Sequence, residues 1–229
     1  MSLVAAWEVH NEPLKGMLNS GKELIRKQCS RAGIIVPQLV TELSDMHLLG
    51  RSMDADVNET LLFHTPCPSA LLSIIDSGFN ERYSGATTGT MLGEGTYFAD
   101  DIGKSDQYGV RDNGASAIEF QSLHRALYAE PQDAPPDVFY TLLCFVTVGF
   151  PLEINDPGPA RHPLHPQHRS EPVVFANDGQ NRRELSNIPG TCFPHHALVC
   201  RNTSNKYSEF VCYHGERAYP AFLLAYKRS

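Results

Sequence analysis

The sequence lacks three features, and each absence excludes a class of protein. No stretch approaches the ~18 to 20 consecutive apolar residues of a membrane-spanning helix, so no membrane partner is expected. The amino terminus, MSLVAAWEVHNEP, has no basic region ahead of a long apolar run, which argues against a secretory signal and favours an intracellular protein. None of the six cysteines forms a C-x-x-C pair, so we expect free thiols and no bound metal.

Positive charge is also scarce. The sequence has 19 lysines and arginines and 26 acidic residues, which gives a formal net charge of -7. The basic runs NRRE and YKRS are too short to line a groove, so nucleic acid is not an expected partner. A length of 229 residues without internal repeats predicts a single domain spanning residues 1–229.

The patterns that are present predict an α+β fold. Apolar residues recur at helical spacing over Leu14–Lys27, over Pro37–Leu49 and in CPSALLSIIDSGF, where Ser69 is placed to cap a helix. Later segments are rich in β-branched and aromatic residues and predict strands: FYTLLCFVTVGF, EPVVFA, SEFVCY and YPAFLLAY. We therefore expect a helical part (1–59) and a β-rich core (60–229) of two packed, mainly antiparallel sheets.

His64 ends an apolar strand in the segment LLFHTPCP. A lone histidine in such a place is more often a core hydrogen-bonding residue than a ligand-binding one. Because Pro66 restricts Thr65 to extended conformations, however, Thr65 is expected to present a backbone donor and acceptor on one side of the chain. That pair is complementary to a carboxamide group.

The segment GEGTYFADDIGKSDQY combines glycines, aromatic rings and a hydroxyl group. Its glycines permit close backbone approach ahead of Tyr97, and Tyr108 lies beyond a turn that carries Ser105. Two rings and one hydroxyl are able to hold a flat ligand by stacking and hydrogen bonding. The alternative is that Tyr97 and Phe98 are ordinary strand residues.

Glu209 opens the apolar strand SEFVCY, where a carboxylate is out of place. A charge at the start of a strand usually faces water. We find no obvious basic partner for Glu209 among its neighbours in the sequence, so a structural salt bridge is not the expected explanation.

Together these segments resemble the catalytic domain of the poly(ADP-ribose) polymerase family, the diphtheria-toxin-like ADP-ribosyltransferases. NETLLFHT resembles the family's strand ending in His-Gly-Thr or His-Gly-Ser, and SGFNERYSG resembles its Gly-Phe-x-x-Arg turn. LGEGTYFADDIGKSDQY is very similar to its Gly-x-Gly-x-Tyr-Phe-Ala segment. YSEFVCYHGERAYPAFLLAY is similar to the strand that carries the family's glutamate, and AAWEVHNEPLKGML to the opening of such domains. Tankyrase-type members are the most similar.

The resemblance implies an NAD-using ADP-ribosyltransferase with a catalytic triad of His64, Tyr97 and Glu209. NAD would lie in a cleft between the sheets and contact His64, Thr65, Arg82, Tyr97, Ser105 and Tyr108. The acceptor would be a protein or an ADP-ribose chain. Such a triad is compatible with transfer of one unit or of many, and neither the acceptor nor the oligomeric state follows from the sequence.

The sequence departs from the family pattern in several places. Thr65 replaces the family's glycine, and a threonine forced to positive φ would cost about 1 to 2 kcal/mol. The zinc-binding cysteines of tankyrase-type domains and the helical regulatory subdomain of DNA-activated members are missing. A catalytically silent NAD-binding or protein-binding domain of the same fold is therefore the main alternative, and an unrelated β-sandwich is a remote one. Pro163 and Pro166 separate His162, His165 and His168, which favours a loop on the acceptor side over a metal site.

Overall fold

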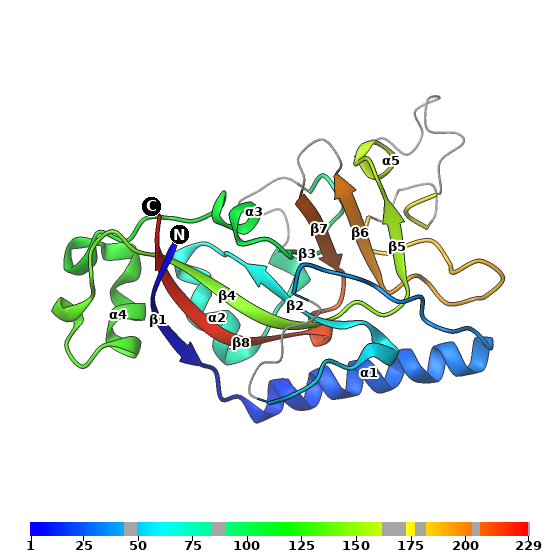
Figure 1. Cartoon of the computed structure of the whole chain (residues 1–229), viewed down its shortest axis with the longest axis horizontal. Helices are drawn as coiled ribbons and strands as arrows, with labels where there is room; N and C mark the ends of the chain where they lie inside the picture. The colour runs from blue at the N-terminus through cyan, green and yellow to red at the C-terminus, as the bar shows by residue number, and fades with distance from the viewer. Residues whose placement is uncertain (44–49, 84–89, 162–172, 177–181, 203–206, 229) are drawn as a thin grey trace.

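A computed structural model describes residues 1–43, 50–83, 90–161, 173–176, 182–202 and 207–228 of the chain (Figure 1). The strands are β1 Ser2–Glu8, β2 Glu59–His64, β3 Thr96–Ala99, β4 Phe139–Thr147, β5 Pro151–Ile154, β6 Ala197–Asn202, β7 Tyr207–Cys212 and β8 Ala218–Lys227. The α-helices are α1 Glu12–Ala32, α2 Pro68–Ser77, α3 Ile102–Asp106, α4 Gln121–Leu127 and α5 Gly158–Arg161. Short 3-10 helices include η1 Ala55–Val57, η2 Glu81–Tyr83 and η8 Gly215–Arg217.

The eight strands form one sheet in the order β1-β8-β4-β2-β3-β7-β6-β5. Every pairing is antiparallel except β5 with β6, so the expected α+β, mainly antiparallel architecture is confirmed. The sequence led us to expect two packed sheets. Instead, the two halves, β1-β8-β4-β2 and β3-β7-β6-β5, are joined by a single register pair between Phe63 and Ala99.

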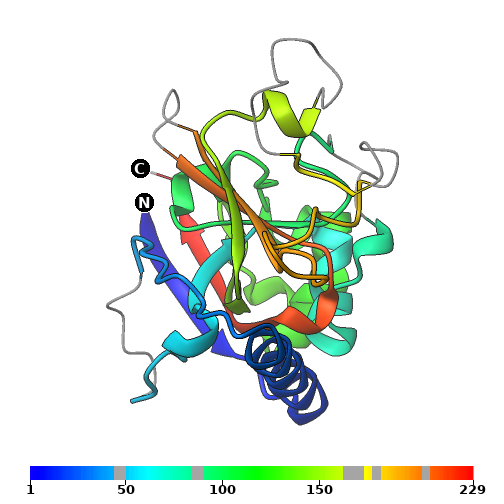
Figure 2. The same cartoon turned by 90° about the vertical axis from the view of Figure 1, so that its right-hand side faces the viewer.

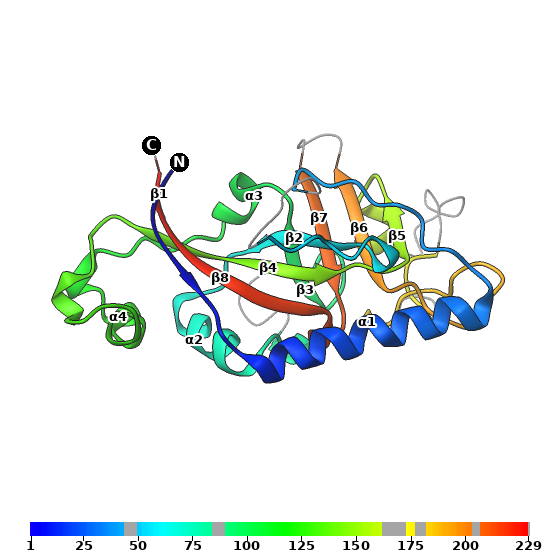
Figure 3. The same cartoon turned by 60° about the horizontal axis from the view of Figure 1, so that its bottom comes forward.

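The central strand β4 shows why its sequence is apolar without alternation. All nine of its residues are buried. Leu142, Cys144 and Val146 face a core shared with α2 and α4, whereas Leu143 and Phe145 face a second core shared with α1. A strand covered on both faces needs apolar residues at every position. Figures 2 and 3 show α1, in blue, running beside the strands, and it contacts β4 and β8.

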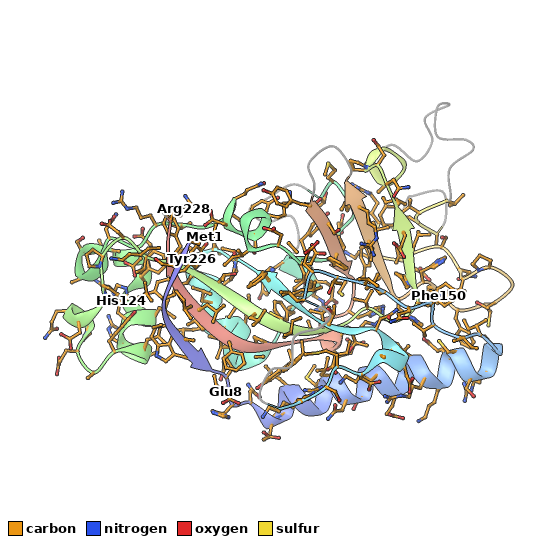
Figure 4. All side chains as sticks on the ribbon, viewed as in Figure 1. Met1, Glu8, His124, Phe150, Tyr226 and Arg228 are labelled. Carbon is orange, nitrogen blue, oxygen red and sulfur yellow. The ribbon has the colours of Figure 1, made fainter. Side chains whose placement is uncertain are left out.

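Helix α1 is longer than the predicted Leu14–Lys27. The Asn11 side chain accepts a hydrogen bond from Leu14 N–H, and Gly33 ends the helix with a φ of 63° in the left-handed region. The same N-terminal part also supplies β1, which pairs with β8 in the register Ser2 to Lys227. Residues 1–59 therefore contribute a strand as well as a helix, and Figure 4 shows Met1 beside Arg228.

The helix predicted over Pro37–Leu49 is wrong for its described part, because residues 37–43 contain no helix. This chain segment is held by Asn58, whose side chain donates to Pro37 O at 2.8 Å and accepts from Leu39 N–H at 3.0 Å. Leu39 packs against the main core. Tertiary contacts therefore override the helical periodicity, while residues 44–49 lie outside the described part of the chain.

Two smaller expectations also fail. Ser69 does not cap α2, because the helix begins at Pro68 and Cys67 is its N-cap residue. The strand predicted in EPVVFA is absent from its described residues, where Phe175 forms only an isolated bridge with Leu185. No helix in the described ranges has the length and apolar character needed to cross a membrane.

Candidate active site

His64, Tyr97 and Glu209 lie on the three neighbouring strands β2, β3 and β7. Ala99 on β3 is the register partner of both Phe63 and Glu209, so this row of residues crosses the junction between the two halves of the sheet. His64 stands next to Phe63, and Tyr97 stands two residues before Ala99. The fold therefore brings together three residues that are distant in the sequence.

The geometry around His64 fixes its tautomer. His64 Nδ1 lies 2.7 Å from Tyr97 O, and since a carbonyl oxygen only accepts, Nδ1 carries the hydrogen. The ring packs edge-on against Phe79, with 5.2 Å between the ring centroids, and also contacts Phe98. Burial lowers the pKa of His64, against the smaller opposing effect of the bond to Tyr97. The neutral ring therefore offers Nε2 as a hydrogen-bond acceptor.

The Tyr97 side chain anchors the turn that precedes its strand. Its hydroxyl accepts from Leu92 N–H and donates to Gly93 O, both at 2.8 Å. Burial raises the pKa of Tyr97, and the nearby charge of Glu209 adds to this increase. Gly93 has a φ of +95°, and a Cβ there would lie 2.6 Å from Arg182 O. The spacing Gly-x-Gly-x-Tyr is thus explained by the turn.

Glu209 is buried and has a basic partner, which corrects the expectation drawn from the sequence. Lys104 Nζ lies 2.7 Å from Glu209 Oε1. Lys104 reaches it from α3, which begins three residues after the end of β3 and is capped by Asp101. Burial alone would lower the pKa of Lys104, but the carboxylate of Glu209 outweighs that effect and raises it. The same ammonium group lies 5.7 Å from the centre of the Tyr108 ring.

Thr65 and Ser105 meet through their side chains. Their hydroxyl oxygens lie 2.8 Å apart, and the Thr65 hydroxyl also donates to Thr141 Oγ1 at 2.8 Å. In the described part of the chain only Asn58 and Asp137 are non-glycine residues with positive φ, so Thr65 does not carry that strain. Helix α3 packs against β2 and β3, which explains how Ser105 reaches Thr65 (Figure 1).

The remaining predicted site residues are more exposed. Tyr108 follows α3 with 46% of its surface accessible. Arg82 is exposed in η2, where its backbone N–H donates to the side chain of Asn80. Among the described residues, no hydrogen bond or ion pair joins Arg82 to the other predicted site residues.

Two residues of the site were missed by the sequence analysis: Lys104 and Thr141. Lys104 directly precedes the predicted Ser105 in α3, and Thr141 is the neighbour of Leu142, which pairs with His64. No group of three or more potential metal-ligating side chains occurs among the described residues. His162, His165 and His168 lie outside those residues.

Comparison with known families identifies the fold family. The sequence model described as the poly(ADP-ribose) polymerase catalytic domain matches residues 40–228, which is most of the chain. The chain belongs to the poly(ADP-ribose) polymerase catalytic domain family. Its α+β structure with a mainly antiparallel sheet is thus an ADP-ribosyltransferase fold.

Proposed function

We propose that this domain transfers ADP-ribose from NAD to an acceptor and releases nicotinamide. The observation that carries the proposal is the convergence of His64, Tyr97 and Glu209 on the adjacent strands β2, β3 and β7. Membership of the poly(ADP-ribose) polymerase catalytic domain family supports it. The acceptor would be a protein side chain or the hydroxyl of an ADP-ribose chain, and residues 1–229 would act together as one catalytic domain.

In this proposal the nicotinamide end of NAD binds beside β3 and α3. The Tyr97 and Tyr108 rings hold the nicotinamide ring by stacking, while Thr65 and Ser105 bind its carboxamide. His64 Nε2, left as an acceptor by the bond from Nδ1 to Tyr97 O, receives a hydrogen bond from a ribose hydroxyl. Arg82 would contact NAD from the exposed η2 turn.

Glu209 is assigned the electrostatic part of the reaction. Nicotinamide leaves the anomeric carbon as a neutral base, so the ribose acquires oxocarbenium character and positive charge. A buried carboxylate near that carbon stabilises the charge in the transition state more than in the ground state. Lys104 holds one carboxylate oxygen at 2.7 Å and so fixes the orientation of the group.

The test is to compare Glu209→Gln with the unmodified protein. Glutamine keeps the volume but loses the charge, so NAD affinity should stay nearly unchanged while nicotinamide release falls by about 10² or more. The matched control is Glu153→Gln on β5. It breaks a different ion pair, in which Arg201 Nε lies 2.7 Å from Glu153 Oε2. Melting curves report whether loss of the Lys104 partner alters folding.

Two results would contradict the assignment. Equal nicotinamide release by Glu209→Gln and the unmodified protein would remove Glu209 from catalysis. NAD binding without any release by the unmodified protein would favour the second candidate, a silent NAD-binding domain, for which the replacement of the family's glycine by Thr65 is the supporting observation. Mass analysis of the products from labelled NAD identifies the acceptor and the number of units transferred.

A further inference from the structure

Three side-chain hydroxyl groups form a buried hydrogen-bonded row beside His64. Thr65 Oγ1 lies 2.8 Å from both Ser105 Oγ and Thr141 Oγ1. Thr141 Oγ1 in turn lies 3.2 Å from His64 O. The exposed fractions of Ser105, Thr65 and Thr141 are 5%, 9% and 0%. Ser105 lies on α3, Thr65 directly follows β2 and Thr141 lies on β4, so the row links three elements around the proposed carboxamide site.

The row has a fixed direction. His64 O only accepts, so the single hydroxyl hydrogen of Thr141 points to it. The hydroxyl of Thr65 therefore donates to Thr141, and its own oxygen is left to accept. Ser105 is therefore the donor in the hydrogen bond between Ser105 and Thr65. Bonds aligned in this way strengthen one another.

We propose that Thr65 determines which ligand groups Ser105 binds, by holding the only hydroxyl hydrogen of Ser105. This inference rests on the proposed function, since it assumes that Ser105 faces the carboxamide of the ligand. With its hydrogen directed to Thr65, Ser105 presents lone pairs. It accepts from an N–H group without cost, whereas it donates to a carbonyl oxygen only after leaving Thr65.

Donation to a ligand oxygen carries a measurable penalty. If Ser105 turns its hydrogen to the ligand, the Thr65 hydroxyl has one hydrogen for two oxygen neighbours, Ser105 and Thr141. Either one of the two 2.8 Å contacts then brings together lone pairs, or Thr141 turns its hydrogen from His64 O to Thr65. In both cases the row loses one hydrogen bond. A net hydrogen bond in a buried site corresponds to about a fivefold change in affinity. Thr65 thus disfavours ligands that place a carbonyl oxygen, rather than an N–H group, against Ser105.

The experiment compares two probes of the same shape, benzamide and benzamidine, by calorimetric titration. Benzamide has a carbonyl oxygen where benzamidine has nitrogen. Thr65→Val keeps the branched shape and removes the hydroxyl, which frees the Ser105 hydrogen. Benzamide should then bind about fivefold more tightly, while benzamidine should not gain. Thr65→Ser restores the hydroxyl and should retain the unmodified ratio of the two affinities.

A further pair of variants tests whether the effect passes through Ser105. In a Ser105→Ala background, Thr65→Val should no longer change the ratio of benzamide to benzamidine affinity. A change of pocket shape would alter the affinities of both probes by the same factor, and that result would overturn the inference. Weaker benzamide binding to Thr65→Val would also overturn it. If the unmodified protein binds neither NAD nor either probe, both the proposed function and this inference fail. If NAD and benzamide bind but the ratio is constant across the variants, only the role of Thr65 fails.

Discussion

At the scale of single residues, the site combines groups whose hydrogen bonds are already committed to the protein with groups that are still available. The Tyr97 hydroxyl is used twice, by Leu92 and Gly93, so this side chain has only its ring face to offer a ligand. Tyr108 is more exposed and contacts Lys104 through its ring. Aromatic stacking, rather than phenol chemistry, is therefore the contribution expected from both tyrosines.

Tyr108→Ala should weaken NAD binding by about 1 kcal/mol or more, at least about a fivefold increase in Kd, because one stacking face is lost. Tyr108→Phe keeps the ring and should bind NAD nearly as well. Tyr128→Ala is the control, since Tyr128 packs against Trp7 and its hydroxyl lies 3.2 Å from that of Tyr140. It should lower the melting temperature without changing Kd. Equal losses of affinity in Tyr108→Ala and Tyr128→Ala would remove the stacking role.

At the scale of secondary structure elements, the contact between β3 and β7 depends on a glycine. A Cβ at Gly95 would lie 2.7 Å from Cys212 O and 2.7 Å from Val211 Cγ1. Gly95→Ala should therefore force the two strands apart and destabilise the fold by about 1 to 3 kcal/mol, measured by urea unfolding. The strands concerned carry Tyr97 and Glu209, so NAD affinity should fall as well.

Gly16→Ala is the matched control for that substitution. Gly16 lies inside α1, and a Cβ there would meet nothing within 4 Å. Alanine is the better helix former, so this variant should be more stable by up to about 1 kcal/mol. A Gly95→Ala protein as stable as Gly16→Ala would show that β3 and β7 tolerate a wider spacing.

The elements that the sequence predicted well are those with local signals. Continuous apolar runs predicted β4 and β8, and the resemblance to the poly(ADP-ribose) polymerase family, carried by several ordered motifs, implied that His64, Tyr97 and Glu209 form one site. The failures involve contacts between distant segments. Asn58 holds residues 37–41 away from helical structure, and Lys104 reaches Glu209 from another part of the chain. Neither partner is close in the sequence, so no local pattern reveals it.

At the scale of the whole molecule, stability should depend on pH through buried histidines. His196 Nδ1 accepts from Phe150 N–H at 2.8 Å, and Nε2 lies 2.9 Å from Gln28 Oε1, so the ring is neutral. Burial, helped by the charge of Arg217, lowers the pKa of His196 to about 3. Burial also lowers the pKa values of His64 and His195.

The unfolded chain therefore takes up these protons first as the pH falls below about 6.5, and the free energy of unfolding decreases with it. His196 alone should cost about 1.4 kcal/mol per pH unit between pH 6.5 and its folded pKa. Urea unfolding at pH 7.5, 6.5 and 5.5 measures this slope. His196→Asn keeps an acceptor for Phe150 and should flatten the slope, whereas His10→Asn, at an exposed side chain, should not. Identical slopes in all three proteins would contradict the assignment.

Three of the six cysteines lie on strands, one in one half of the sheet and two in the other. Cys144 lies on β4, and Cys200 and Cys212 lie on β6 and β7; all three are free and buried. Burial raises the pKa of each thiol, to about 12 for Cys200 and Cys212, so none is reactive while its strand is in place. Each thiol therefore becomes reactive toward alkylating reagents only when its own strand opens. The chain carries built-in chemical reporters that show whether the two halves of the sheet open together or one at a time.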